Sequence, residues 1–254
     1  KFNLDRKAQR VRVFELGRVF LRDASVANTD TTVEGFHQPM RVAGVAYGAN
    51  DVLQWGRKEQ GIDFFDVKGD VEAMLAPLRA TFEPGTHPAM HPGRCARVLM
   101  NGKLIGHVGE LHPQWRQSWE LPQAPVLFEL ELDAVLQRTV PQFKAVAKHQ
   151  AVERDLAIVV AERVTHSEVM AAVESAVPAS LLRSAVLFDV YRPKAVRLGE
   201  EPAAGGAVAA GEKSLAVRLT LGSDGASLTE AEIEAAVQAV VTQLVARTGG
   251  RLRV

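Results

Sequence analysis

Seven residues in the C-terminal part of the chain are of the types that proteins use to bind unpaired nucleic-acid bases: Asp155, Ala157, Asp189, Tyr191, Ser214, Ala216 and Arg253. A tyrosine ring stacks on a base, and carboxylates accept hydrogen bonds from base amino or imino groups. Serine and arginine donate hydrogen bonds to base edges or phosphate, and alanines leave room for a flat ring. We interpret this set as a base-binding surface.

Three segments must bring six of these residues together: 153–160, 187–192 and 213–219. Arg253 follows near the end of the chain. Each alternates bulky apolar side chains with small or polar ones, which is typical of a strand with one buried face. The alternation predicts a free face that carries the base-binding set together with Arg218. It predicts a buried face formed by Leu156, Ile158, Phe188, Val190, Leu215 and Val217.

Two helices are predicted between these strands. Thr165 and Thr229 are each followed by a glutamate three residues later, which is the spacing of a capping box at a helix start. The second helix carries an apolar stripe of Ile233, Val237, Val240, Val241, Leu244 and Val245. It should end at Gly249, and 251–254 reads as a last strand with both arginines on the free face. The order β-α-β-β-α-β predicts a ferredoxin-like sandwich.

The N-terminal part reads as a second α+β domain, built on an antiparallel sheet. Residues 11–20, 40–47 and 128–132 read as strands, and the segment 63–69 leads into a helix over 70–79. Strands at 94–99 and 104–109 should form a hairpin that turns at Asn101-Gly102. The fold class is therefore α+β, an antiparallel-sheet module followed by the sandwich.

Two segments of the chain read as connections. Residues 138–148 contain Pro141 and form an extended connector, which gives domains at 1–138 and 147–254. Residues 199–211 are mostly Ala, Gly and Glu and have no core-forming side chain beyond Val208, so we expect a mobile loop.

Composition limits the kinds of partner. The 254 residues carry 30 basic and 30 acidic side chains, whereas a protein that grips duplex nucleic acid through many phosphates is basic. Contacts with nucleic acid should therefore be local and directed at bases. A single cysteine, Cys95, fits a reducing cytoplasm, and no apolar run is long enough to span a bilayer. The chain does not begin with Met and reads as a piece of a longer protein.

Other chemical sites have plainer interpretations. Histidines at 87, 91, 107 and 112 with Cys95 lack the spacing of a zinc motif, and His91-Pro92-Gly93 reads as a turn. Arg18 and the segment 35–38 resemble parts of an ATP and substrate site, but a second arginine in a glycine-rich helix start is missing. Asp66 and Glu110 should be solvated or act as caps. We predict no metal and no catalytic residue.

Several motifs together resemble a known family. F-E-L-G-R-V-F at 14–20, D-F-F-D-V-K-G at 63–69, H-P-G-R at 91–94 and I-G-H-V-G-E-L-H-P at 105–113 resemble the catalytic-like module of the bacterial phenylalanyl-tRNA synthetase beta subunit. R-D-L-A at 154–157, F-D-V-Y at 188–191 and K-S-L-A at 213–216 are similar to its ferredoxin-fold anticodon-binding domain. The matching motifs run in the expected order over nearly the whole chain. His149-Gln150 and the insertion at 199–211 depart from the family pattern.

The resemblance implies a division of roles. The first module would have a class II synthetase fold without catalytic residues, and the second would bind the anticodon stem-loop of tRNA(Phe). ATP, Mg²⁺ and phenylalanine chemistry would belong to an alpha subunit. Alpha and beta subunits would form a heterotetramer in the complete cytoplasmic enzyme, and this fragment would bind no cofactor itself. Two alternatives stay open: a self-sufficient synthetase-like enzyme, and a structural interaction module that binds no RNA.

Overall fold

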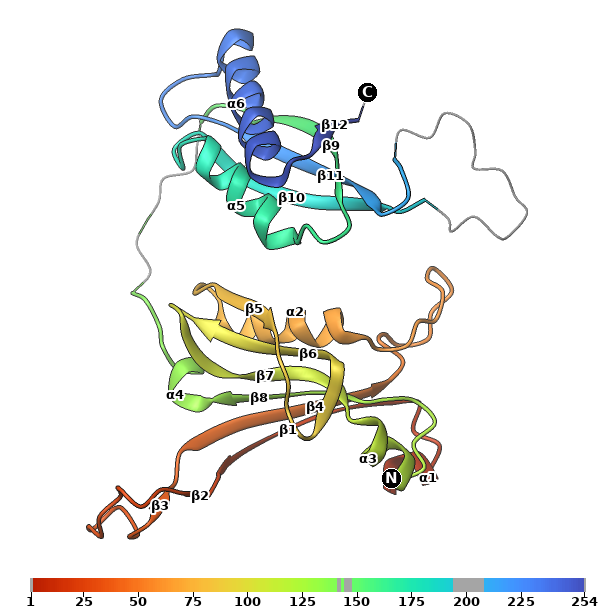
Figure 1. The fold of residues 1–254 in the computed structure, drawn as a ribbon, viewed down its shortest axis with the longest axis vertical. Helices are drawn as coiled ribbons and strands as arrows, with labels where there is room; N and C mark the ends of the chain where they lie inside the picture. The colour runs from red at the N-terminus through yellow and green to blue at the C-terminus, as the bar shows by residue number, and fades with distance from the viewer. Residues whose placement is uncertain (1, 141–142, 144–147, 194–207, 254) are drawn as a thin grey trace. The chain divides into compact units, whose positions relative to one another are not determined.

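The chain forms two compact units, residues 1–142 and 143–254, in a computed structural model that describes residues 2–140, 143, 148–193 and 208–253 (Figure 1). Each unit combines an antiparallel sheet with helices, so the α+β fold class is confirmed. Most of the predicted connector, at 141–142 and 144–147, lies outside the described residues, and so do residues 199–207 of the predicted loop.

A six-stranded sheet forms the N-terminal unit, in the order β1-β4-β8-β7-β6-β5 with every neighbouring pair antiparallel. Its strands are β1 (Arg10–Arg18), β4 (Met40–Gly48), β5 (Ala80–Pro84), β6 (Met90–Met100), β7 (Lys103–Leu111) and β8 (Val126–Glu131). The remaining elements are α1 (Phe2–Asp5), α2 (Phe64–Leu75), α3 (Pro113–Ser118), α4 (Leu132–Val135) and a small ribbon of β2 (Leu21–Arg22) with β3 (Phe36–His37).

Helix α2 covers one face of this sheet and begins earlier than the sequence predicted. The Asp63 carboxylate accepts hydrogen bonds from the backbone N–H groups of Phe65 and Asp66, at 2.8 and 3.1 Å, and the Asp66 carboxylate accepts one from Asp63 at 2.8 Å. This capping box starts the helix at Phe64, inside the segment 63–69 that was predicted to precede the helix. The prediction of a helix over 70–79 is therefore wrong in its bounds, and the capping role of Asp66 is confirmed.

Strands β6 and β7 form the predicted hairpin at Asn101-Gly102. Both residues have positive φ angles, 52° and 78°, which a two-residue turn of this type requires. Glu110 on β7 accepts two hydrogen bonds from the Arg94 guanidinium, at 3.0 and 2.8 Å, so it is ion-paired. His91-Pro92-Gly93 was predicted to form a turn, but it lies within β6 at a register irregularity.

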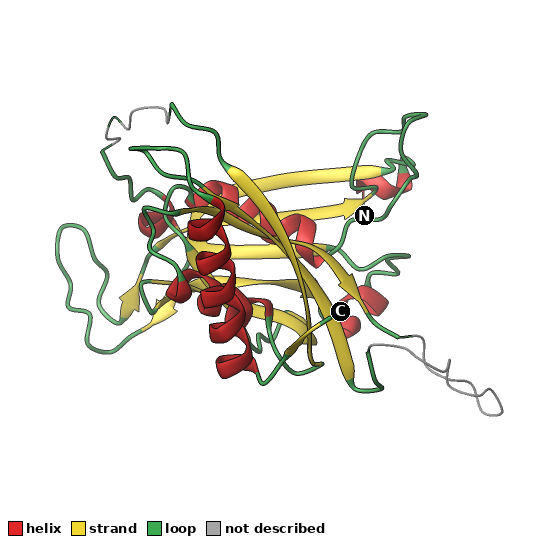
Figure 2. Cartoon of the chain, turned by 90° about the horizontal axis from the view of Figure 1, so that it is seen from above, coloured by secondary structure: helices red, strands yellow, loops and turns green. Residues whose placement is uncertain are grey.

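The C-terminal unit has the predicted β-α-β-β-α-β order. Its elements are β9 (Val152–Ala161), α5 (His166–Ala176), β10 (Leu182–Tyr191), β11 (Glu212–Leu221), α6 (Glu230–Thr248) and β12 (Arg251–Leu252). The antiparallel sheet has the order β10-β11-β9-β12, and both helices lie on one of its faces (Figures 1 and 2). The ferredoxin-like sandwich is confirmed.

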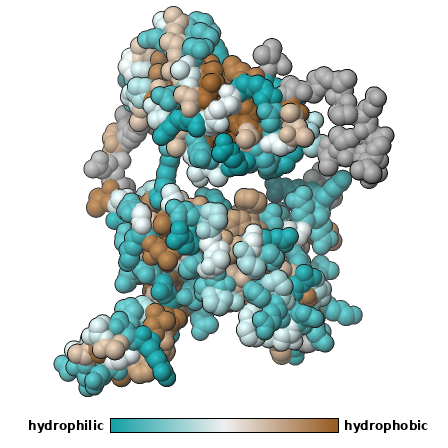
Figure 3. Space-filling model, in the orientation of Figure 1, coloured by the Kyte–Doolittle hydropathy of each residue, from teal (hydrophilic) through white to brown (hydrophobic). Residues whose placement is uncertain are grey.

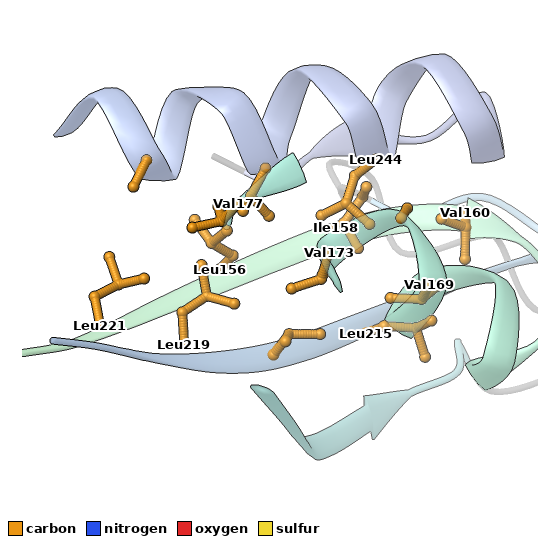
Figure 4. Packing of buried hydrophobic residues seen from close by; sticks show 14 of the residues in the cluster. Leu156, Ile158, Val160, Val169, Val173, Val177, Leu215, Leu219, Leu221 and Leu244 are labelled. Carbon is orange, nitrogen blue, oxygen red and sulfur yellow. The ribbon is translucent and has the colours of Figure 1, made fainter. Parts of the chain in front are cut away.

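Apolar side chains between the two helices and this sheet form the core of the unit (Figure 4). Val173 on α5, Leu244 on α6 and Leu219 on β11 are fully buried. Both predicted capping boxes are present, and Gly249 ends α6 with a left-handed φ of 67°. Val245 is 42% exposed, so its predicted place in the apolar stripe is wrong.

None of the helices in the described part of the chain combines the length and the apolar composition needed to cross a lipid bilayer.

Candidate nucleic-acid interface

The face of the second sheet opposite α5 and α6 carries the residues that the sequence selected for base binding. In the register, Asp189 and Ala157 flank Ala216, and Tyr191 lies beside Ser214. Because side chains on neighbouring strands share a face when their residues pair, these groups point to the same side. We call this surface the open face and define it by Asp155, Ala157, Val159, Phe188, Asp189, Tyr191, Ser214, Ala216, Arg218 and Arg253.

Tyr191 and Arg253 meet across this face. The Arg253 guanidinium carbon lies 5.1 Å from the centroid of the Tyr191 ring, which is a cation–π contact. The Arg253 backbone N–H donates to the Ala157 carbonyl at 2.8 Å, which places Arg253 beside β9, at the opposite edge of the sheet from β10. The arginine side chain therefore crosses β9 and β11, from beside Ala157 to the tyrosine, which pairs with Ser214. Tyr191 still has 45% of its surface exposed.

Asp155 is held by an arginine. Its two carboxylate oxygens accept hydrogen bonds from Nε and Nη2 of Arg218, both at 2.8 Å, and Glu153 lies 3.4 Å from the same guanidinium. The hydrogen bond from Arg218 lowers the pKa of the Asp155 carboxyl below its ordinary value. Asp155 thus positions Arg218 and is not an open acceptor for a base.

Asp189 differs from Asp155 because it makes no hydrogen bond or ion pair with any described residue. Its side chain is exposed beside Ala216, between the two aromatic side chains of β10. Ser214 is 3% exposed and belongs to the floor of the open face, with the half-buried Ala157 and Ala216. Of the predicted polar groups, Asp189 is the carboxylate that remains available for hydrogen bonding.

Phe188 was predicted to face the helices, and this prediction is wrong. The β10–β11 register shifts between Leu187 and Asp189, so Phe188 is the extra residue of a β-bulge. The residue is 52% exposed, and its ring centroid lies 5.3 Å from the Arg218 guanidinium carbon, on the open face. Val190 pairs with the buried Leu215, as its predicted place on the buried face requires, but it is 39% exposed because β10 is an edge strand.

Charges around the open face are largely paired within the protein. Arg251, opposite Val159, donates two hydrogen bonds to the Glu212 carboxylate, and these lower the pKa of Glu212 to about 2 with help from the Ala209 N–H. Arg192 donates to Glu162 at 2.9 Å. A surface of paired charges around an aromatic ring and a carboxylate that has no partner among the described residues favours bases over phosphates as its ligands.

The N-terminal unit contains the residues that were considered for an ATP site and for a metal site. Arg18 donates a 2.9 Å hydrogen bond to the carbonyl of Gln38, so its guanidinium is tied to the backbone of the neighbouring segment. The His87 and His107 rings lie 5.1 Å apart, and burial, reinforced by His87, lowers the pKa of His107. Among the described residues, no group of three or more His, Cys, Asp or Glu is arranged to hold a metal ion.

Comparisons with known proteins agree with this division. Residues 1–132 match the model of the phenylalanyl-tRNA synthetase beta chain CLM domain, and residues 147–253 match the ferredoxin-fold anticodon-binding domain. The chain is similar over its whole length to phenylalanine–tRNA ligase beta subunits of Cupriavidus pinatubonensis (48% identical) and Ralstonia nicotianae (47%), and over 99% of its length to that of Chromobacterium violaceum (43%).

The chain spans 31% of the length of the first two relatives and 29% of the third. The family model of the CLM domain matches more than half of the chain, which confirms the resemblance found in the sequence motifs. This chain therefore belongs to the phenylalanyl-tRNA synthetase beta-chain family.

Proposed function

We propose that this chain is the part of a phenylalanine–tRNA ligase beta subunit that binds the anticodon stem-loop of tRNA(Phe) with its open face. The observation that carries the proposal is the placement of two groups around a floor of Ala157 and Ala216: the exposed Tyr191, and Asp189, whose carboxylate has no partner among the described residues. This placement lies in the region that matches the ferredoxin-fold anticodon-binding domain.

Each group has a distinct role in base recognition. An unpaired base stacks on the Tyr191 ring, and the alanines leave space for its edge. Asp189 accepts a hydrogen bond from an amino or imino group of the base, and its negative charge disfavours phosphate at the same place. Arg253, which covers Tyr191 in the free protein, is placed to stack on the bound base or to pair with a phosphate. Asp155 acts indirectly by holding Arg218.

The charging reaction belongs, in this proposal, to an alpha subunit that binds ATP, Mg²⁺ and phenylalanine. The alternative of a self-sufficient enzyme is disfavoured by Arg18, whose guanidinium is bonded to a backbone carbonyl. The N-terminal unit would then serve as a scaffold for the alpha subunit within a heterotetramer.

An exposed apolar strand supports this scaffold role. Strand β1 lies at the edge of the six-stranded sheet, and Val13, Phe14 and Leu16 are all more than half exposed, Phe14 at 74%. Phe20, just after β1, is also exposed, and Figure 3 shows hydrophobic side chains at the surface of the N-terminal unit where β1 leads towards β2. Phe14 and Leu16 share one face of the strand and Val13 lies on the other, because successive side chains alternate. Exposed apolar side chains on an edge strand are typical of a protein–protein contact.

The test of tRNA recognition is electrophoretic mobility of tRNA(Phe) with this chain, beside a tRNA that has a different anticodon. We expect tighter binding of tRNA(Phe), because the open face reads bases and the balanced charge of the chain gives little non-specific attraction. No binding to either tRNA would favour the interaction-module alternative, and equal affinity for the two tRNAs would contradict recognition of the anticodon.

A further inference from the structure

A second aromatic side chain on the open face is arranged like Tyr191. The bulge turns Phe188 onto this face, where the residue is 52% exposed with the Arg218 guanidinium carbon 5.3 Å from its ring centroid. Tyr191 is 45% exposed, with the Arg253 guanidinium carbon at 5.1 Å. The open face therefore carries two pairs of an exposed aromatic ring and an arginine, and the sequence pattern revealed one of them.

Arg218 is fixed more firmly than an isolated surface arginine. Two hydrogen bonds of 2.8 Å join it to Asp155, and Glu153 lies 3.4 Å away on its other side. A bidentate pair sets the plane of the guanidinium as well as its position. A flat cation held beside an exposed ring forms a ready platform for a base, because bases stack on both aromatic rings and guanidinium planes.

We propose that Phe188, with Arg218, is a second base-stacking position, so that the open face binds two bases of one single-stranded loop. This inference rests on the proposed function, since it assigns a further residue to the same RNA-binding surface. Tyr191 would stack on one base, Phe188 would stack on another, and Asp189 would accept a hydrogen bond between them. Asp155 and Glu153 would be positioning residues that act through Arg218.

The spacing of the two rings fits this arrangement. Phe188 and Tyr191 are three residues apart on β10, which corresponds to about 10 Å along a strand before the bulge shortens it. Two unstacked nucleotides of one loop reach positions at such a separation, whereas a single base does not cover both. Asp189 lies between the two rings in the chain, opposite Ala216.

A purely structural role for Phe188 predicts something different. If the ring only supported Arg218, its removal would change the stability of the fold or lower affinity for every RNA by the same factor. A stacking role predicts that the loss depends on one nucleotide of the RNA. The discriminating measurement is therefore the coupling between a protein side chain and a single base.

The experiment measures binding of the 254-residue chain to a synthetic anticodon stem-loop of tRNA(Phe), and to versions with one abasic nucleotide at each loop position in turn. Phe188→Ala should weaken binding of the intact loop by about 5- to 150-fold, the range of one lost base stack. One abasic loop will already lack the base that stacks on Phe188, and with that loop the replacement should cause almost no further loss of affinity. Tyr191→Ala should show the same pattern with a different loop position.

Val186→Ala is the matched control. Val186 lies on β10 opposite Arg218 and is 53% exposed, but it carries no ring. Its replacement should change affinity by less than about twofold, as is usual for surface positions. Thermal unfolding of each variant establishes that binding is measured on folded protein.

The outcomes separate this inference from the proposed function. If Tyr191→Ala weakens binding while Phe188→Ala does not, the second stacking position is wrong and the anticodon-binding role stands. If Phe188→Ala weakens binding equally for every abasic loop, its role is structural and the inference is also wrong. If neither replacement affects binding, both the inference and the proposed function are overturned.

Discussion

Arg253 lies over the ring of Tyr191, with its guanidinium carbon 5.1 Å from the ring centroid, although the two residues approach from opposite edges of the sheet. To make this contact the arginine side chain crosses β9 and β11. The residues that it crosses have short side chains: Ala157 and Ala216 lie in the register row beside Arg253, and Val159 and Ser214 lie in the row of Tyr191. It stabilises an exposed aromatic ring in the free protein and holds a cation where RNA would bind. The small residues thus give the open face both its floor and its cation–π pair.

Replacement of Tyr191 tests the first stacking position. Tyr191→Ala should weaken binding of tRNA(Phe) by roughly tenfold or more, since one base stack contributes about 1–3 kcal/mol. Tyr191→Phe keeps the ring and should retain most of the affinity. The dissociation constants are measured by titration calorimetry. If Tyr191→Ala binds tRNA(Phe) as tightly as the parent chain, the assignment of the open face is wrong.

Two ion pairs, Asp155–Arg218 on the open face and Glu212–Arg251 beside it, should titrate independently. Hydrogen bonds from Arg251 and from the Ala209 N–H lower the pKa of Glu212 to about 2, and Arg218 lowers the pKa of Asp155. Carboxylates with a depressed pKa stabilise the fold above the pKa of the unfolded chain, about 4 for these groups, and lose that contribution as pH falls through the folded value. Unfolding midpoints should therefore fall as the pH is lowered from about 5 to 2.

Carboxyl NMR titration of two variants checks the assignment. Arg251→Gln should raise the pKa of Glu212 and leave Asp155 unchanged, because Glu212 is bonded to Arg251. Arg218→Gln should raise the pKa of Asp155 and leave Glu212 unchanged. Each variant is the control for the other. A titration of Glu212 that does not respond to Arg251→Gln would show that this ion pair does not form in solution.

Regular alternation allowed most of the second unit to be predicted. Segments 153–160 and 213–219 lie within β9 and β11, the central strands, where pairing on both sides keeps the period of two and one face is buried. The two threonine capping boxes were predictable because a cap depends on residues only three positions apart.

The errors have local physical causes. Phe188 was misplaced because a bulge adds one residue to an edge strand, and an apolar residue at that point looks like part of the buried face. The predicted first residue of helix α2 was too far along the chain, because the helix is capped by a box that uses aspartate at both positions, Asp63 and Asp66. The Asp155–Arg218 pair is formed across neighbouring strands, so it depends on a register that the sequence alone does not reveal.

The inserted segment can be tested by deletion. Residues 199–207 contain few apolar side chains, so their removal should leave the melting temperature nearly unchanged. Val208 is 7% exposed and the Ala209 N–H donates to Glu212 at 2.9 Å, so a deletion that extends through Ala209 should lower the melting temperature by several degrees. Differential scanning calorimetry compares the two deletions. A loss of several degrees on removing 199–207 alone would mean that this segment packs on the fold.

The isolated chain, without an alpha subunit, should show no adenylation activity. Arg18 is bonded to the Gln38 carbonyl, and the sequence lacks a second arginine of an ATP site, so phenylalanine-dependent exchange of pyrophosphate into ATP should be absent. The measurement uses labelled pyrophosphate, with a complete phenylalanine–tRNA ligase as the positive control. Exchange that is abolished by Arg18→Ala would establish the self-sufficient enzyme instead.

Stability measurements distinguish the open face from the core of the same sheet. Leu219 on β11 is fully buried between sheet and helices, and Leu219→Ala should lower the free energy of unfolding by about 2–5 kcal/mol. Phe188 has half of its surface exposed, so Phe188→Ala should cost clearly less than a buried phenylalanine, below about 2 kcal/mol. Urea unfolding followed by circular dichroism gives both values. If Phe188→Ala is as destabilising as Leu219→Ala, the Phe188 ring is buried in solution and the bulge does not place it on the open face.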